Sequence, residues 1–143
     1  MNFLLDTNVV SEWVKPRPDP GVIRWTESVD EDRVFLSVIS FGELRYGAER
    51  MAAGARRRRL EEWLQDELPL RFEGRVLPVD NNVADAWGKT VSRSEALGRP
   101  IGVMDAFLSA TAETHRLTLV TRNVSDFPLL KALLNPWEED GDQ

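Results

Sequence analysis

The sequence contains no cysteine and only one histidine, His115. The absence of cysteine excludes disulfide scaffolds, thiol catalysis and thiolate metal sites, and a single histidine excludes a metal or catalytic centre built from several imidazoles. No apolar run approaches the ~18–20 residues of a membrane-spanning helix. The first residues lack the basic segment of a signal peptide and reach an acid at Asp6. We therefore expect a cytoplasmic protein that does not bind membranes.

Positive charge is also scarce. The chain has 18 Lys and Arg against 24 Asp and Glu, a net charge of −6. Such a balance argues against nucleic acid as a partner, because phosphates are held by Lys and Arg. Net charge is a weak guide when charges are clustered, however. Acids gathered around a metal ion lower the total while they prepare the protein to meet phosphates through that ion.

The chain length and composition are those of one folded domain. Of 143 residues, 42% are hydrophobic and 29% are charged. A chain of this size builds its own core, and its composition is not that of a disordered protein. We expect a single domain over residues 1–137 and an acidic, frayed tail over residues 138–143.

Short apolar runs alternate along the chain with segments of helical character. The expected strands cover residues 3–5, 33–36, 75–79 and 117–120, and residues 129–134 form an edge strand or a helical turn. The expected helices cover 9–14, 20–29, a segment from Ser37 or Ser40 to about 53, 55–68, a segment capped by Asn81 or Asn82, and 103–115. This alternation predicts an α/β fold with a mostly parallel central sheet of about four to five strands and helices on both faces.

Acidic and amide side chains recur at positions that this topology brings to one edge of the sheet. Asp6 directly follows the first strand, Glu43 lies early in the helix after the second strand, and Asp105 begins the helix that leads into the fourth. Asn123 and Asp126 follow the fourth strand. Because α/β sheets bind ligands outside the carboxyl ends of their strands, we expect these side chains around one crevice.

Carboxylates this close repel one another, which raises their pKa values unless a cation neutralises them. Oxygen ligands without Cys or His favour Mg²⁺, with Mn²⁺ as a substitute. Such ions activate water and stabilise displacement at phosphorus. Each residue also has a simpler explanation: Asp6 or Asp105 as a helix cap, Glu43 as an exposed helical acid, and Asn123 as a turn cap.

Several segments together carry a resemblance to a known family. They are residues 4–12 (LLDTNVVSE), 40–47 (SFGELRYG), 105–112 (DAFLSATA) and 120–127 (VTRNVSDF), with the closing residues 135–137 (NPW). In this order they resemble the PIN domains of VapC-type toxins, in the FitB-like branch. The resemblance implies a Mg²⁺-dependent endoribonuclease toxin that is held inactive by a VapB-like antitoxin. It also implies a homodimer, which forms a heterotetramer or a larger assembly with the antitoxin.

The resemblance assigns roles residue by residue. It implies that Asp6, Glu43 and Asp105 bind the metal and act in catalysis, and that the hydroxyls of Thr7 and Thr121 support them. The chain departs from the family at Asn123, where many relatives carry a fourth Asp. Asp126, three residues later, is the other candidate for that catalytic position. Since a neutral amide adds no charge, we expect one firm metal site and a weaker second one.

Two other functions are compatible with acids at strand ends. A phosphoacceptor receiver-like signalling module normally has an acidic pair after its first strand and a lysine after a late strand, whereas here Asp6 stands alone and Arg122 occupies the late position. The second alternative is a FitB-like partner of a DNA-binding antitoxin with little nuclease activity.

The basic run Arg56–Arg59 has two explanations. It grips an RNA backbone or an acidic partner, or it is a solvated helix face. The aromatic residues are expected in core or dimer contacts rather than as platforms for bases, namely Trp13, Trp25, Trp63 and Trp87.

Overall fold

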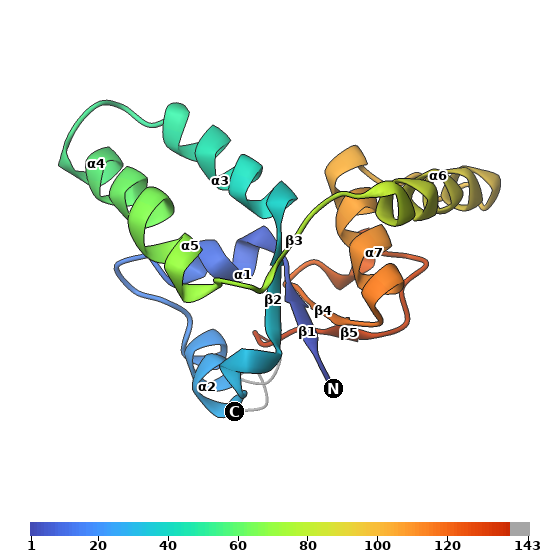
Figure 1. Ribbon diagram of the computed structural model, residues 1–143, viewed down its shortest axis with the longest axis horizontal. Coiled ribbons are helices and arrows are strands. Elements are labelled where there is room, and N and C mark those ends of the chain that lie inside the picture. Colours follow the sequence, from blue (N-terminus) through green and yellow to red (C-terminus); the bar gives the residue numbers. More distant parts are fainter. Residues whose placement is uncertain (138–143) are drawn as a thin grey trace.

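Parallel strands form the centre of the protein, as predicted. The computed structural model describes residues 1–137, and the predicted acidic tail over 138–143 lies outside the described residues. The five strands pair in the order β3-β2-β1-β4-β5 (Figure 1), and every pair is parallel. Their bounds are β1 Phe3–Leu5, β2 Val34–Ser37, β3 Val76–Leu77, β4 Thr118–Val120 and β5 Leu133–Leu134. The segment 129–134 therefore ends in an edge strand.

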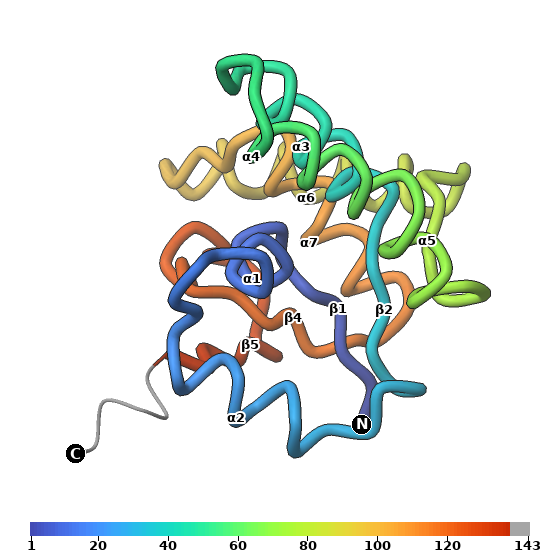
Figure 2. The backbone as a smooth tube through the Cα atoms, turned by 90° about the vertical axis from the view of Figure 1, so that its left-hand side faces the viewer, coloured from blue at the N-terminus to red at the C-terminus, as the bar shows by residue number. Residues whose placement is uncertain are grey.

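Helices cover both faces of the sheet. Figure 1 shows α1, α2, α4 and α5 on one side of the strands and α6 and α7 on the other, and Figure 2 views the molecule from the side of α1, α2, α4 and α5. The α-helices are α1 Thr7–Glu12, α2 Pro20–Ser28, α3 Val38–Glu49, α4 Ala55–Glu62, α5 Leu68–Arg71, α6 Asn81–Ala96 and α7 Val103–His115. Short 3-10 turns cover η1 Glu31–Arg33 and η3 Val124–Asp126, and a π-helical turn, η2 Trp63–Glu67, joins α4 to α5. Within residues 1–137, none of the helices has the length and apolar character needed to cross a membrane.

Two cores lie on opposite sides of the sheet, because successive strand side chains point to opposite faces. In β1, Phe3 and Leu5 belong to the larger core, which also contains residues of α1, α2 and α3 and of the segment from η2 to α5. Leu4 belongs to the smaller core, with α7. β2 repeats the pattern, with Leu36 in the larger core and Phe35 against the smaller one. This double burial explains why the strands read as continuous apolar runs.

Polar side chains at strand ends begin the next helix. Asp6 accepts a hydrogen bond from the Thr7 N–H at 2.6 Å, so α1 begins at Thr7, earlier than predicted. Ser37, rather than the alternative Ser40, caps α3 by accepting from the Ile39 N–H at 3.0 Å. After β1 and β2, the residue that ends the strand or directly follows it thus fixes where the next helix starts.

The predicted cap of α6 was wrong. Asp80 occupies the cap position and accepts from the Val83 N–H at 2.9 Å, whereas Asn81 and Asn82 already lie inside the helix. An ionised carboxylate is a strong acceptor for the free N–H groups of a first turn. Helix α3 is also shorter than predicted, since it ends at Glu49.

Three of the tryptophans, Trp25, Trp63 and Trp87, form core or aromatic contacts, as predicted. Trp25 is buried and meets Phe3 edge-on, with ring centroids 5.3 Å apart. Trp87 stacks on Phe107 at 5.1 Å and so joins α6 to α7. Trp63 packs against the larger core. These rings pack helices against the sheet and against each other.

Candidate active site at the carboxyl edge of β1 and β4

Strand β1 lies between β2, its neighbour along the chain, and β4, which comes from the far end of the chain. The strand order therefore reverses at β1, and connections leaving β1 and β4 diverge. Such a switch point is where open parallel sheets bind ligands. Asp6 follows β1 and Thr121 follows β4, and the Asp6 N–H donates to the Val120 carbonyl at 2.9 Å. The two strands thus remain paired up to the edge of the site.

Asp6 is held on both of its oxygens and is only 7% exposed. Oδ1 accepts from the Thr7 N–H at 2.6 Å, and Oδ2 accepts from the Thr121 hydroxyl at 2.8 Å. Burial raises the pKa of the Asp6 carboxyl, and the two hydrogen bonds oppose this change without cancelling it. Asp6 caps α1, as the simpler explanation stated. It also accepts a hydrogen bond from Thr121, the residue that directly follows β4.

Glu43 is tied to α1 through the side chain of Thr7. Thr7 Oγ1 donates to Glu43 Oε1 at 2.5 Å and lies 3.0 Å from the hydroxyl oxygen of Ser40. Glu43 is half-buried rather than exposed. The simpler explanation, an exposed helical acid, is therefore wrong, and Glu43 is joined to the residue that follows Asp6.

Asp105 lies in the first turn of α7, half-buried at the same edge. Burial raises the pKa of Asp105 to about 6, helped by the charges of Asp6, Asp126 and Glu43 in that order. No hydrogen bond from residues 1–137 reaches its carboxylate. Gly102 occupies the cap position of α7, so the explanation of Asp105 as a helix cap was wrong.

Asn123 and Asp126 differ in what they bring to this edge. The Asn123 N–H donates to Thr121 Oγ1 at 3.0 Å, while its exposed side chain caps nothing in the turn η3 that follows. Asp126, the last residue of η3, contributes a negative charge that raises the pKa of both Asp6 and Asp105. Of the two candidates for the fourth position, Asp126 is electrostatically coupled to the other acids.

The donors at this edge fit a hard divalent cation, since all of them are oxygens from carboxylates and hydroxyls. A cation would also stabilise the charged forms of Asp6 and Asp105, whose pKa values are raised by burial and, to a smaller extent, by the neighbouring acids. Within residues 1–137, however, no three Asp, Glu or His side chains stand close enough together to enclose an ion. Coordination by three of these carboxylates therefore requires at least one to move inward.

Comparison with known proteins identifies the family. Residues 3–129, most of the chain, match the PIN domain. The chain belongs to the PIN domain family. Toxin FitB of Neisseria gonorrhoeae is 36% identical over 138 residues, which cover 96% of this chain and 99% of the relative. VapC ribonuclease Y4jK of Sinorhizobium fredii is 35% identical over 137 residues, covering 95% and 98% of the two chains.

Solved structures agree with the sequence relatives. This PIN domain superposes on a chain of FitAB bound to an IR36 DNA fragment with a TM-score of 0.88 at 34% identity, covering 94% of this chain and 95% of that chain. The resemblance to VapC-type toxins and the predicted fold are thereby confirmed. The receiver-like alternative is wrong, because residues 3–129 match the PIN domain and the fold matches that of FitAB.

Two side chains of this PIN domain reach the site without having been predicted there, Asn8 and Ser40. The Asn8 amide donates to Asp6 Oδ2 and to Thr121 Oγ1, each at 3.4 Å, and its Oδ1 accepts from the Arg122 N–H at 3.4 Å. Ser40 lies one helical turn before Glu43 in α3, and its hydroxyl is 3.0 Å from that of Thr7. The available signal was spacing, since each residue sits within one turn of a predicted acid.

A groove leads away from the site between α1 and the arm formed by α3 and α4. Its volume is 730 Å³, and it extends from Thr7 and Glu43 to Arg56 and Arg59. Most of the remaining wall is apolar, and Ser11, Lys15 and Glu67 are its other polar residues. The apolar lining residues are Val14, Pro16, Leu44, Met51, Leu60 and Trp63.

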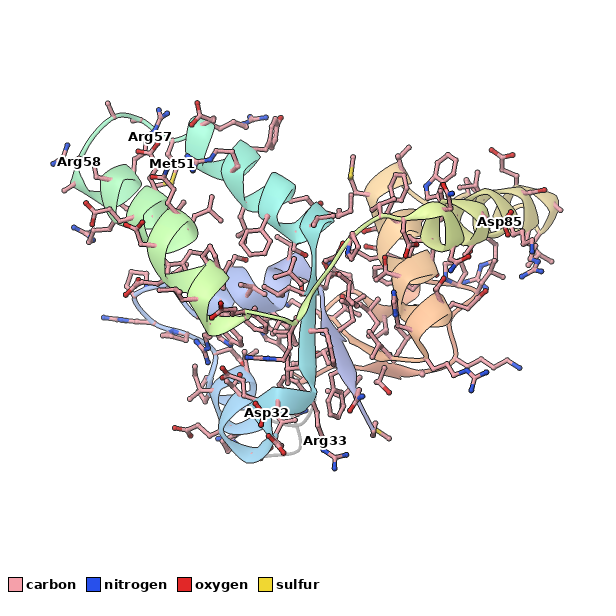
Figure 3. All side chains as sticks on the ribbon, viewed as in Figure 1. Asp32, Arg33, Met51, Arg57, Arg58 and Asp85 are labelled. Atoms are coloured by element: carbon pink, nitrogen blue, oxygen red, sulfur yellow. The ribbon has the colours of Figure 1, made fainter. Side chains whose placement is uncertain are left out.

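The basic run of α4 divides into different environments. Arg57 pairs with Glu49 at 3.2 Å and with Glu61 at 3.7 Å. Figure 3 shows Arg57 and Arg58 with Met51 at the outer end of the arm. Arg58 is exposed and forms no side-chain ion pair with the described residues, whereas Arg56 and Arg59 line the groove. The four arginines therefore have different surroundings, and neither explanation, a fully solvated helix face or a single phosphate-binding surface, describes all of them.

Proposed function

We propose that this PIN domain is a divalent-metal-dependent endoribonuclease and the toxin of a toxin–antitoxin pair, working in the cytoplasm. The observation that carries the proposal is the convergence of Asp6, Glu43, Asp105 and Asp126 at the switch point of the sheet, where the charges of Glu43 and Asp126 help to raise the pKa of both Asp6 and Asp105. Relatives named Toxin FitB and VapC ribonuclease support the same activity.

Asp6 and Asp105 hold the metal in this proposal, with Glu43 as a further ligand, directly or through water. Mg²⁺ is the expected ion and Mn²⁺ its substitute, because the donors are hard oxygens. When bound, such an ion supplies an activated water and neutralises charge that develops at phosphorus.

The chain's own residues orient the reacting groups. Thr7 and Thr121 fix the two oxygens of Asp6, so that this carboxylate keeps one direction. Glu43 has one oxygen engaged by Thr7 and uses the other to orient the attacking water and accept its proton. Asp126 would add negative charge for a weaker second cation, which an RNA phosphate would help to hold.

The test is cleavage of RNA by the toxin freed of its antitoxin, with Mg²⁺, with Mn²⁺ and with EDTA. We expect cleavage with either ion, and loss of cleavage in EDTA and in Asp6→Asn. A second candidate function is a FitB-like partner of a DNA-binding antitoxin with little nuclease activity, favoured by the likeness to FitAB bound to DNA. Absence of cleavage with both ions, combined with DNA binding by the complex, would support that second function instead.

The groove is the proposed docking site of a VapB-like antitoxin segment. Its apolar wall at Leu44, Leu60 and Trp63 suits apolar side chains, and Arg56 and Arg59 suit acidic ones at the far end. At the near end a basic antitoxin residue would meet the acids of the site. Since the groove opens onto Thr7 and Glu43, a segment lying in it blocks access to the metal-binding edge.

Co-expression with the product of the neighbouring small open reading frame tests the docking site. Leu60→Asp should weaken capture of that protein, because it places a charge in the apolar wall. Leu97→Asp, at an exposed leucine outside the groove, is the matched control. Equal capture by both variants would move the antitoxin to another surface.

A homodimer is the proposed assembly of the free toxin. Val38, Val103 and Met104 are exposed apolar residues, 41%, 57% and 45% accessible, at the neighbouring starts of α3 and α7. A second copy covering this patch would bury it and place two sites near each other. Val103→Glu should shift the mass measured by light scattering towards the monomer, whereas Leu70→Glu, at an exposed leucine of α5, should not.

A further inference from the structure

Ser40 is a fully buried hydroxyl at the edge of the site, with 0% exposure. It lies in α3 one turn before Glu43, and it does not cap that helix, because Ser37 does. Among the described residues, its side chain has one hydrogen-bond partner, the hydroxyl of Thr7, at an oxygen–oxygen distance of 3.0 Å. The role of this buried hydroxyl therefore has to be sought through Thr7.

The direction of the hydrogen bonds follows from counting protons. Thr7 has one hydroxyl proton and two oxygen neighbours, Glu43 Oε1 at 2.5 Å and Ser40 Oγ at 3.0 Å. An ionised carboxylate only accepts, so the Thr7 proton goes to Glu43. The proton between the two hydroxyls must then come from Ser40. The result is a directed chain in which Ser40 donates to Thr7 and Thr7 donates to Glu43.

We propose that Ser40 is a positioning residue for the nuclease reaction, which acts by holding the Thr7 hydroxyl in the orientation that donates to Glu43. The inference rests on the proposed function, in which Glu43 orients water at the metal. Without the Ser40 donor, the Thr7 hydroxyl is held by Glu43 alone, so the rotamers of both side chains are fixed less firmly. With the donor, Oε1 is occupied, and Oε2, which receives no hydrogen bond from the described residues, is presented to the cation or its water.

The chain supplies a matched control in Ser94. Its hydroxyl is also buried, at 0% exposure, but it has no hydrogen-bond partner within the described residues. Ser40→Ala and Ser94→Ala therefore remove the same atom from equally buried sites. They differ in whether that atom is connected to a candidate metal-binding acid.

The experiment measures Mn²⁺ binding by calorimetry, thermal unfolding, and kcat and KM on a single-stranded RNA of mixed sequence. In Ser40→Ala we expect Mn²⁺ affinity or kcat to fall by about 10- to 100-fold, as for other groups that orient metal ligands, with KM for RNA nearly unchanged. Ser94→Ala should leave Mn²⁺ affinity and kcat at wild-type values. If Ser40→Ala does not fold, Ser40→Cys keeps the volume with a weak donor and carries the same comparison.

A double-mutant cycle with Thr7→Val decides whether Ser40 acts through Thr7. Once the Thr7 hydroxyl is gone, adding Ser40→Ala should have no further effect on Mn²⁺ affinity, whereas a merely structural role gives additive losses. Additive losses, or a Ser40→Ala variant equal to wild type in both readouts, would overturn the inference. Failure of wild type to cleave RNA would overturn the proposed function, and the Mn²⁺ cycle would still test Ser40 by itself.

Discussion

The half of the site built on β1, α1 and β4 differs in kind from the half built on α7 and η3. In the first half, Asp6 receives hydrogen bonds from Thr7, Thr121 and Asn8. In the second half, the carboxylate of Asp105 receives none from the described residues, and its pKa rises to about 6. Hydrogen bonds fix the carboxylate of Asp6, whereas the carboxylate of Asp105 is partly buried beside other acids without such bonds from the described residues.

This difference indicates how the fold prepares a cation site without closing it. Hydrogen bonds orient Asp6 before any ion arrives, which lowers the ordering cost of binding. Asp105 remains adjustable, which agrees with the absence of a ready-made cluster of three ligands in the described chain. We expect substitutions in the fixed half to change geometry, and substitutions in the adjustable half to change mainly charge.

The largest expected effect is on the acids that hold the metal. Asp6→Asn and Asp105→Asn should each lower Mg²⁺-dependent kcat by about 10³-fold or more, because removing the ion removes its activation of water. Asp105→Asn should keep or raise the melting temperature in EDTA, while Asp6→Asn perturbs the oriented half. Asp19→Asn, a capping acid before α2, is the control and should cleave RNA normally. Full activity in either site variant would contradict the metal assignment.

Glu43→Gln should have the next largest effect. The amide keeps the shape of the side chain and can still accept from Thr7, but it cannot take a proton from water. We expect kcat to fall by about 10²-fold or more with a small change in KM, the range for loss of a general base. Steady-state kinetics with excess Mg²⁺ measure this split. A change confined to KM would make Glu43 a binding residue.

Changing the charge at Asn123 and Asp126 tests how the adjustable half contributes to divalent-ion binding. Asn123→Asp should tighten divalent-ion binding by about tenfold, most clearly for a second equivalent, because it adds charge to a weak position. Asp126→Asn should weaken the same step by a similar factor. Calorimetric titrations of both variants measure the effects. If neither titration changes, residues 121–126 form only a structural turn.

The smallest expected effect is on pH-dependent stability without metal. The pKa of Asp105 rises from its ordinary value of 3.8 to about 6 in the folded protein. Between these values the folded chain keeps a proton that the unfolded chain has lost, so its free energy of unfolding falls as pH rises and levels off above about pH 6. The raised pKa of Asp6 acts in the same direction.

Asp105→Asn removes the larger part of that pH dependence. Urea unfolding in EDTA at about pH 4.5 and about pH 7.5 should show the variant gaining on wild type more at the higher pH than at the lower one. The gain corresponds to about 2 °C in melting temperature, small because the carboxyl still contacts solvent. A variant that loses stability at both pH values would show that Asp105 makes a structural contact.

Local sequence predicted what depends on neighbouring residues. The apolar runs at 3–5 and 117–120 identified the central strands closely, since buried strands need side chains on both faces. Strand β3 shrank from the expected 75–79 to Val76–Leu77, and the cap of α6 moved to Asp80. Competing polar residues stand side by side at that point, and only the geometry of the turn decides which one caps.

The site was predicted as a set of acids but not as a network. Parallel topology alone brings Asp6 and Asp105 to one edge. The link from Ser40 through Thr7 to Glu43 depends on how α1 and α3 pack, over a separation of 33 to 36 residues. No periodicity in either segment encodes that packing. The different environments of Arg56 and Arg57 likewise depend on which α3 acids face α4.

The pairing of β1 with β4 has a consequence for when the candidate site is completed during synthesis. The Thr121 hydroxyl reaches Asp6 across a sequence separation of 115 residues. Until the ribosome has released that distant stretch, β1 has one open edge, and Asp6 lacks the partner that orients it. The contacts that orient Asp6 are therefore complete only late in translation, so the proposed nuclease activity would begin only after nearly the whole chain has been made.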